Sequence, residues 1–165
     1  MNSSLTKIYW DTKLPIYKVS HSKLSKMGIT CLLIDVDGTL LSRNSIIIPK
    51  RVKNWIIKAK EIFDLYLISN NLSEKRIYKI GKELGIKYKY GALKPRIKKT
   101  LEVINNLNKD KNNIAIIGDR IFTDIIVGNR CKIKTILIQR LNKKGLPLKF
   151  NTTLFFEKFI SLFLF

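Results

Sequence analysis

Short, unbroken apolar runs alternate along this chain with segments in which apolar residues recur every three or four positions. Unbroken runs are typical of strands buried on both faces of a sheet, and the wider spacing is typical of helices with one buried face. The two patterns predict strands at 29–34, 65–68, 88–90, 114–117 and 133–138, and helices at 22–27, 51–63, 73–84, 96–107 and 124–130. Their alternation predicts an α/β domain: a doubly wound, Rossmann-like and mostly parallel sheet with helices on both faces.

The length and composition of the chain indicate one domain with an extension at each end. Of its 165 residues, 45% are hydrophobic, which is enough apolar material for a core. We expect an irregular N-terminal arm at 1–28, a catalytic core at 29–141, and a basic linker with an apolar tail at 142–165. The N-terminus lacks the apolar run of a secretory signal. We therefore expect a location in the cytoplasm or in an organelle matrix or stroma, with peripheral membrane contact as an option.

Polar side chains follow directly on three of the predicted strands. Asp35 and Asp37 follow the first strand, Ser69 and Asn70 the second, and Asp119 comes just after the fourth. In a doubly wound sheet, ligands bind at the carboxyl ends of the strands. We therefore expect these side chains to share one site.

The Asp-Val-Asp-Gly-Thr run at 35–39 suggests the chemistry of that site. Gly38 permits a turn after the strand, so that two carboxylates can converge, and Mg²⁺ would offset their repulsion because it prefers oxygen ligands. Asp35 could then attack phosphorus as a nucleophile and form an aspartyl-phosphate, with Asp37 as general acid and base. The alternative is an Asx turn that merely closes a strand, which suits an isolated Asp-Gly pair better than this longer run.

The other polar residues have plausible places in a phosphate site, and each also has a simpler explanation. Ser69 and Asn70 could hold phosphate oxygens, although a helix cap or loop would explain a serine equally well. Lys94 could balance the charge of the carboxylates and a phosphate, but one lysine among 25 is weak evidence. Asp119 is a candidate metal ligand, and Asp124 could orient it or the metal's water molecules, unless Asp124 only caps a helix.

Taken together, these residues resemble the four ordered motifs of the haloacid dehalogenase (HAD) superfamily. The motifs are Asp-Val-Asp-Gly-Thr-Leu at 35–40, Ser69, Lys94, and Gly-Asp at 118–119 with Asp124. The resemblance implies that Asp35 is the nucleophile and a metal ligand, and that Asp37 is the acid/base and gives its backbone carbonyl to Mg²⁺. It also implies that Ser69 and Lys94 bind the phosphoryl group and that Asp119 completes the metal site.

A closer resemblance extends over residues 14–141. The runs at 14–17, 118–124 and 128–130 are similar to the YqeG branch, HAD subclass IIIA, whose relatives include mitochondrial phosphatidylglycerophosphate phosphatases. The sequence departs from that branch at Gly38, where many members carry Asn, and at Arg120, where Gln is frequent. The resemblance implies a phosphatase, with phosphatidylglycerophosphate as the best single substrate.

The spacing of the motifs leaves no room for a cap domain over the site. The 30 positions from Thr39 to Ser69 and the 23 from Asn71 to Lys94 each accommodate about one helix and one strand. An open site suits substrates that bring their own bulk, such as a lipid head group, a nucleic-acid end or a protein. A sugar phosphatase, or a non-catalytic binding protein that keeps the HAD fold, would carry the same motifs.

Charge and the apolar tail bear on the partner. The net charge of +20 indicates an anionic partner, such as a phosphorylated substrate, an acidic membrane or nucleic acid, although codon bias in an AT-rich genome also produces lysine. The tail at 154–165 is apolar and aromatic and too short to span a bilayer. It could lie in a membrane interface, pack on the sheet or form a dimer.

Overall fold

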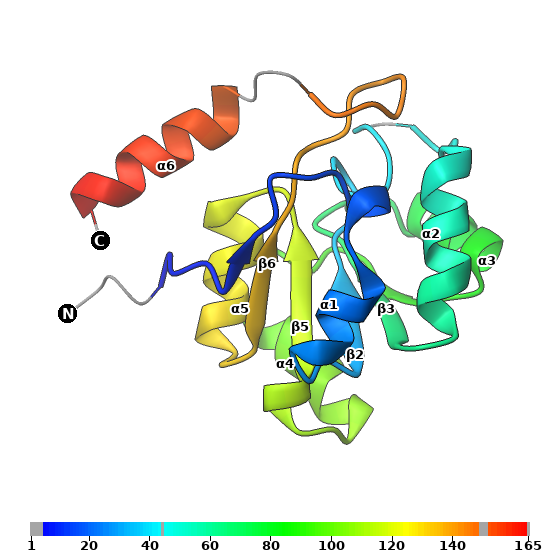
Figure 1. Ribbon diagram of the computed structural model, residues 1–165, viewed down its shortest axis with the longest axis horizontal. Coiled ribbons are helices and arrows are strands. Elements are labelled where there is room, and N and C mark those ends of the chain that lie inside the picture. Colours follow the sequence, from blue (N-terminus) through cyan, green and yellow to red (C-terminus); the bar gives the residue numbers. More distant parts are fainter. Residues whose placement is uncertain (1–4, 44, 149–151, 165) are drawn as a thin grey trace.

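The computed structural model describes residues 5–43, 45–148 and 152–164, and a parallel sheet forms its centre (Figure 1). Six strands pair in the order β1-β6-β5-β2-β3-β4, every neighbour parallel. The strands are β1 (Trp10–Asp11), β2 (Cys31–Ile34), β3 (Asp64–Ile68), β4 (Lys87–Lys89), β5 (Ile114–Gly118) and β6 (Lys134–Leu137). From β2 the chain winds outward to β3 and β4, and it then returns to add β5 and β6 on the other side. This order confirms the predicted doubly wound fold and puts its switch point between β2 and β5.

Helices cover both faces of this sheet. They are α1 (His21–Lys26), α2 (Lys50–Lys60), α3 (Glu74–Leu84), α4 (Lys98–Leu107) and α5 (Ile126–Arg130). Three short turns, η1 (Ile16–Lys18), η2 (Lys111–Asn113) and η3 (Ile121–Ile125), and a C-terminal helix, α6 (Thr152–Leu164), complete the described elements. Alternate residues of a strand point to opposite faces. Leu32 therefore packs with the apolar sides of α1, α2 and α3, whereas Leu33 packs with α4 and α5. The connections between these elements hold no additional domain within the described residues.

Local signals fix the ends of α3, the helix that faces the candidate site. The hydroxyl of Ser73 accepts a hydrogen bond from the Arg76 backbone N–H and caps the first turn. Gly85, with φ of 62°, ends the helix in the left-handed conformation that glycine adopts without strain. Both residues mark the ends that the sequence predicts for this helix.

Two segments differ from the sequence prediction. The N-terminal arm, expected to be irregular before its short helix, adds β1 to the edge of the sheet, where Trp10 aligns with Ile136. The helix expected at 124–130 is divided, because residues 121–125 form the wider π-helical turn η3 before α5 begins. That turn matters for the site, because it lies directly after Asp119.

The C-terminal helix α6 lies against η3 at the side of the domain (Figure 1). Leu154 packs there with Ile121, Ile125 and Leu137, and Glu157 is buried. Residues 149–151 of the expected linker and Phe165 of the expected tail lie outside the described residues. None of the described helices has the length and apolar character needed to cross a bilayer.

Candidate active site

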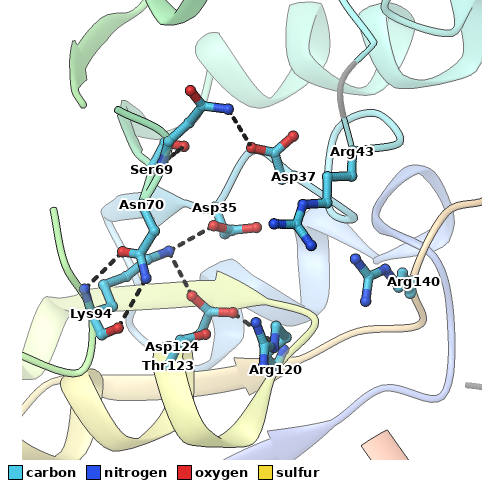
Figure 2. Close-up of a pocket in the computed structure, with 11 residues that line it drawn as sticks. Asp35, Asp37, Arg43, Ser69, Asn70, Lys94, Arg120, Thr123, Asp124 and Arg140 are labelled. Carbon is cyan, nitrogen blue, oxygen red and sulfur yellow. Dashed lines mark hydrogen bonds and ion pairs between the residues drawn. The ribbon is translucent and has the colours of Figure 1, made fainter. Parts of the chain in front are cut away.

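The predicted site residues meet at the carboxyl edge of the sheet, at the switch point. In-register pairing of Ile34 with Leu67 and with Ile117 brings the ends of β2, β3 and β5 side by side. A pocket of about 160 Å³ opens there (Figure 2). It is lined by Asp35, Asp37, Arg43, Ser69, Asn70, Asn71, Lys94, Arg120, Thr123, Asp124 and Arg140. Asp119 belongs to the same group but lies deeper.

Three buried carboxylates form the floor of this pocket. Asp35, Asp119 and Asp124 each offer an oxygen, and these oxygens lie within 4.8 Å of one another. Asp35 extends β2, Asp119 follows β5, and Asp124 reaches back from η3. The sequence predicts Asp124 only as a supporting residue, whereas its carboxylate lies as close to the cluster as the other two.

Lys94 is the buried cation that faces this cluster. Its ammonium group donates to the Asp35 carboxylate at 2.6 Å, the Asp124 carboxylate at 2.6 Å and the Ile68 carbonyl at 3.0 Å. Burial alone would lower the pKa of Lys94, but Asp124 and Asp35 outweigh it and raise the pKa, so the group stays charged. Within the described residues, Lys94 is thus the one buried positive charge that hydrogen-bonds to this cluster.

Burial and mutual repulsion raise the pKa values of two of these carboxylates. Burial raises the pKa of Asp35 to about 6, against the opposing effect of Lys94. Burial, with the charges of Asp35 and Asp124, also raises the pKa of Asp119 well above its ordinary value. Both shifts disfavour the charged form of the carboxylates, and a bound cation would act in the opposite direction.

Asp119 gives the clearest indication that a cation belongs here. Its carboxylate is fully buried, and neither oxygen accepts a hydrogen bond from another described residue. The nearest cationic atom, Arg140 Nε, is 3.4 Å from Oδ2. A buried carboxylate that accepts no hydrogen bond is costly, so the oxygen-rich cluster fits a hard divalent metal ion.

Gly38 leaves the space that this arrangement requires. Its φ is 96°, and a Cβ there would lie 2.6 Å from Asp119 Oδ2. A side chain at this position would therefore press on the carboxylate that the metal needs. The Gly38 departure from the YqeG pattern thus lies at the cluster itself.

Ser69 and Asn70 lie on the side of the pocket next to Lys94, and the Asn70 side chain contacts the Lys94 backbone. The Ser69 hydroxyl accepts from the Asn71 backbone N–H at 3.1 Å, and Ser69 is almost fully buried at the base of the pocket. The Asn70 side chain donates to the Lys94 carbonyl at 2.9 Å and accepts from its N–H at 2.7 Å. The side chain of Asn70, expected to hold phosphate, is thus engaged with the backbone of Lys94.

Asp37 has a partner that the sequence did not reveal. The Arg76 guanidinium on α3 binds its carboxylate through two nitrogens, at 2.7 and 3.1 Å, and also donates to the Ser45 carbonyl at 2.7 Å. This clamp holds the acid/base candidate to the loop after β2. Arg76 lies 39 positions away in sequence, and nothing in the polar face of α3 marks it.

A second unforeseen contact joins the tail to the site. Buried Glu157 on α6 accepts from the Ile121 backbone N–H at 2.8 Å and from Arg120 Nε at 3.1 Å. The Arg120 backbone N–H in turn donates to Asp124 Oδ2 at 3.2 Å. The tail thus holds the turn that carries Asp124. Its apolar sequence gave little sign of this polar contact.

A carboxylate pair follows the central strand, and serine, lysine and aspartate lie at the same edge of the sheet. Fold and site together define a HAD-type phosphatase, which is a phosphoric monoester hydrolase. A family model described as "Mitochondrial PGP phosphatase" matches residues 3–140. The chain belongs to this family. The expected resemblance to the HAD superfamily and its YqeG branch is thereby confirmed.

Individual relatives agree with this assignment. The chain is 28% identical to "Probable phosphatase YqeG" of Bacillus subtilis (strain 168), over 82% of this chain and 80% of the relative. It is 27% identical to "Phosphatidylglycerophosphate phosphatase 1, chloroplastic/mitochondrial" of Arabidopsis thaliana, over 75% of this chain and 38% of that longer protein. A crystal structure of an uncharacterized Listeria monocytogenes protein shares the fold, with a TM-score of 0.57, 19% identity, and coverage of 75% of this chain and 84% of that one.

Proposed function

We propose that the chain is a Mg²⁺-dependent phosphatase that works through an aspartyl-phosphate on Asp35. The single observation that carries the proposal is the cluster of three buried carboxylates that faces one lysine at the floor of an open pocket. Asp35, Asp119 and Asp124, with the Asp37 backbone carbonyl that the resemblance implies, would hold the ion. Bound Mg²⁺ would offset the cluster's charge and that of the incoming phosphate.

Asp35 is placed to attack and Lys94 to hold the phosphate. Lys94 engages Asp35 Oδ1, which leaves Oδ2 to form the bond to phosphorus as the ester bond to the leaving oxygen breaks. The hydroxyl of Ser69 donates to a phosphoryl oxygen. The ammonium of Lys94 donates its three N–H groups to Asp35, Asp124 and Ile68 in the free protein, so one of them turns to the phosphate when it binds. Water then attacks the phosphorus, the bond to Asp35 breaks, and inorganic phosphate leaves.

Asp37 moves the protons in both steps. As an acid it gives a proton to the leaving oxygen, and as a base it takes one from the attacking water. The two-nitrogen contact with Arg76 fixes the position of the Asp37 carboxylate beside the pocket. Arg76 therefore acts as a positioning residue for the proton transfers of Asp37.

The substrate that we favour is phosphatidylglycerophosphate. Its support is the family description, the printed name of the plant relative and the open pocket lined by cationic and polar side chains. Phe155, Phe156 and Phe159 on α6 are each more than half exposed. Together with the basic surface they support a peripheral contact with anionic lipid.

Phosphate release from a substrate panel tests this proposal. The panel pairs phosphatidylglycerophosphate in vesicles with phosphopeptides, sugar phosphates and end-phosphorylated nucleic acid, with and without Mg²⁺. We expect Mg²⁺-dependent release that is fastest with the lipid and is abolished in Asp35→Asn. Asp64→Asn, at the opposite end of the sheet, is the matched control and should keep full activity. Activity that survives Asp35→Asn would exclude the mechanism, and a preference for nucleic acid would exclude the substrate.

A further inference from the structure

Guanidinium groups gather at the active-site pocket although the chain is poor in arginine. Only seven of its 32 basic residues are Arg, and three of them, Arg43, Arg120 and Arg140, line this one pocket. Arginine binds phosphate and carboxylate through two parallel hydrogen bonds, which lysine cannot do. The side-chain type thus indicates recognition of an oxyanion at this place, beyond general attraction.

The guanidinium groups of the three arginines differ in their contacts with other side chains. Arg120 is tied to Glu157 at 3.1 Å. Arg140 lies 3.4 Å from Asp119 through Nε alone. The Arg43 side chain makes no ion pair or hydrogen bond with the rest of the described chain. Arg43 and the outer nitrogens of Arg140 are therefore the groups left for a ligand.

Figure 2 shows Arg43 and Arg140 directed toward the same space, on the side of Asp35 away from Lys94. Ser69 and Lys94 already provide the groups that hold a reacting phosphoryl oxygen on the other side. Two guanidinium groups that converge repel one another, and an anion between them removes that cost. The arrangement is thus built for a second negative group next to the first.

We propose that Arg43 and Arg140 form a second anion subsite, and that the preferred substrate is a phosphomonoester with another phosphate a few bonds away. The inference rests on the proposed function, since the reacting phosphate must sit at Asp35. The second phosphate has two sources: the phosphodiester of a lipid head group or the free end of a soluble bisphosphate. An enzyme with this subsite selects among phosphomonoesters by the charge of the leaving group and makes no specific contacts with the rest of the substrate.

A pair of small substrates isolates the subsite. Propane-1,3-diol monophosphate and propane-1,3-diol bisphosphate differ only in the second phosphate. We expect kcat/KM to favour the bisphosphate by about tenfold, the effect of one charged hydrogen bond, and Arg43→Ala to remove most of that preference. Arg51→Ala, an exposed arginine on α2 outside the pocket, should leave the preference unchanged. An equal loss on both substrates would overturn the proposal, because Arg43 would then serve the reacting phosphate.

Two further measurements distinguish the two sources of the second phosphate and test the subsite even if the proposed catalytic function is wrong. Dihexanoyl phosphatidylglycerophosphate is assayed beside the bisphosphate: a loss with Arg43→Ala on the lipid assigns the subsite to a phosphodiester, and a loss on the bisphosphate alone assigns it to soluble substrates. If neither is turned over, the proposed function fails, and calorimetry still decides the subsite. In Asp35→Asn protein the bisphosphate should bind about tenfold more tightly than the monophosphate, a difference that Arg43→Ala removes. Equal binding of the two would overturn the subsite.

Discussion

Replacement of Lys94 by methionine keeps an apolar side chain of similar length but removes its positive charge. Among the described residues, Lys94 is the one buried cation that donates to the carboxylate cluster. The ammonium group lies 2.6 Å from both Asp35 and Asp124, and its side chain is 1% exposed. Solvent therefore cannot take over its role. Loss of one partner from a buried ion pair costs about 3–5 kcal/mol, because the other charge is left buried and unpaired.

Urea unfolding followed by circular dichroism at pH 8 measures this cost. With a slope of about 2 kcal/mol per M, a loss of about 4 kcal/mol lowers the midpoint by about 2 M in EDTA. Mg²⁺ should restore part of the difference, because it supplies positive charge to the same cluster. Phosphatase activity should fall to background with or without the ion.

A surface lysine offers the matched control. Lys89 also lies 2.6 Å from a carboxylate, that of Glu102, but its side chain is 27% exposed and that of Glu102 is 51% exposed. An exposed pair contributes little, so Lys89→Met should unfold at nearly the wild-type urea concentration. If Lys94→Met in EDTA behaves like Lys89→Met, Lys94 does not offset buried charge and our account of the cluster is wrong.

Three further predictions concern the same site. The pKa of Asp35 in the folded protein is raised from 3.8 to about 6. The free energy of unfolding of metal-free protein should therefore fall by about 3 kcal/mol from this group as pH rises from 3.8 to about 6. The urea midpoint of Asp35→Asn should lack this contribution to the fall. Gly38→Ala should lower stability by about 1–2 kcal/mol and weaken Mg²⁺ binding in calorimetry, and wild-type affinity would contradict the contact with Asp119. Arg76→Ala should slow hydrolysis of the phosphoenzyme more than its formation from p-nitrophenyl phosphate, because that leaving group needs no proton from Asp37. Rapid-quench kinetics measure both rates, and equal slowing of the two would contradict the role of Arg76 in holding Asp37.

The sequence predicted what depends on local pattern and strand order. Buried runs located β2, β3 and β5, and parallel pairing then forced Asp35, Ser69 and Asp119 to one edge, because strands that start in register also end together. Ser73 and Gly85 marked the ends of α3 for the same reason: capping is a local interaction. β1 escaped prediction because two residues carry no periodicity.

The contacts that tune the site could not be predicted in this way. Arg76 reaches Asp37 because α3 packs at one particular angle, and a helical pattern does not specify that angle. Asp124 enters the carboxylate cluster from η3, a π-helical turn that the hydrophobic pattern does not predict. Glu157 is a lone carboxylate in an apolar tail, and only the docked helix shows that it binds the backbone at Ile121.

The covalent intermediate tests the central claim most directly. Wild-type protein with Mg²⁺ and substrate, quenched in acid within one turnover and digested, should yield a phosphoryl adduct that mass spectrometry places on Asp35. With p-nitrophenyl phosphate, whose leaving group needs no proton, Asp37→Asn should accumulate more of that adduct, because the base for its hydrolysis is missing. A phosphoryl group on any other residue, or full turnover by a protein with asparagine at position 35, would contradict the account.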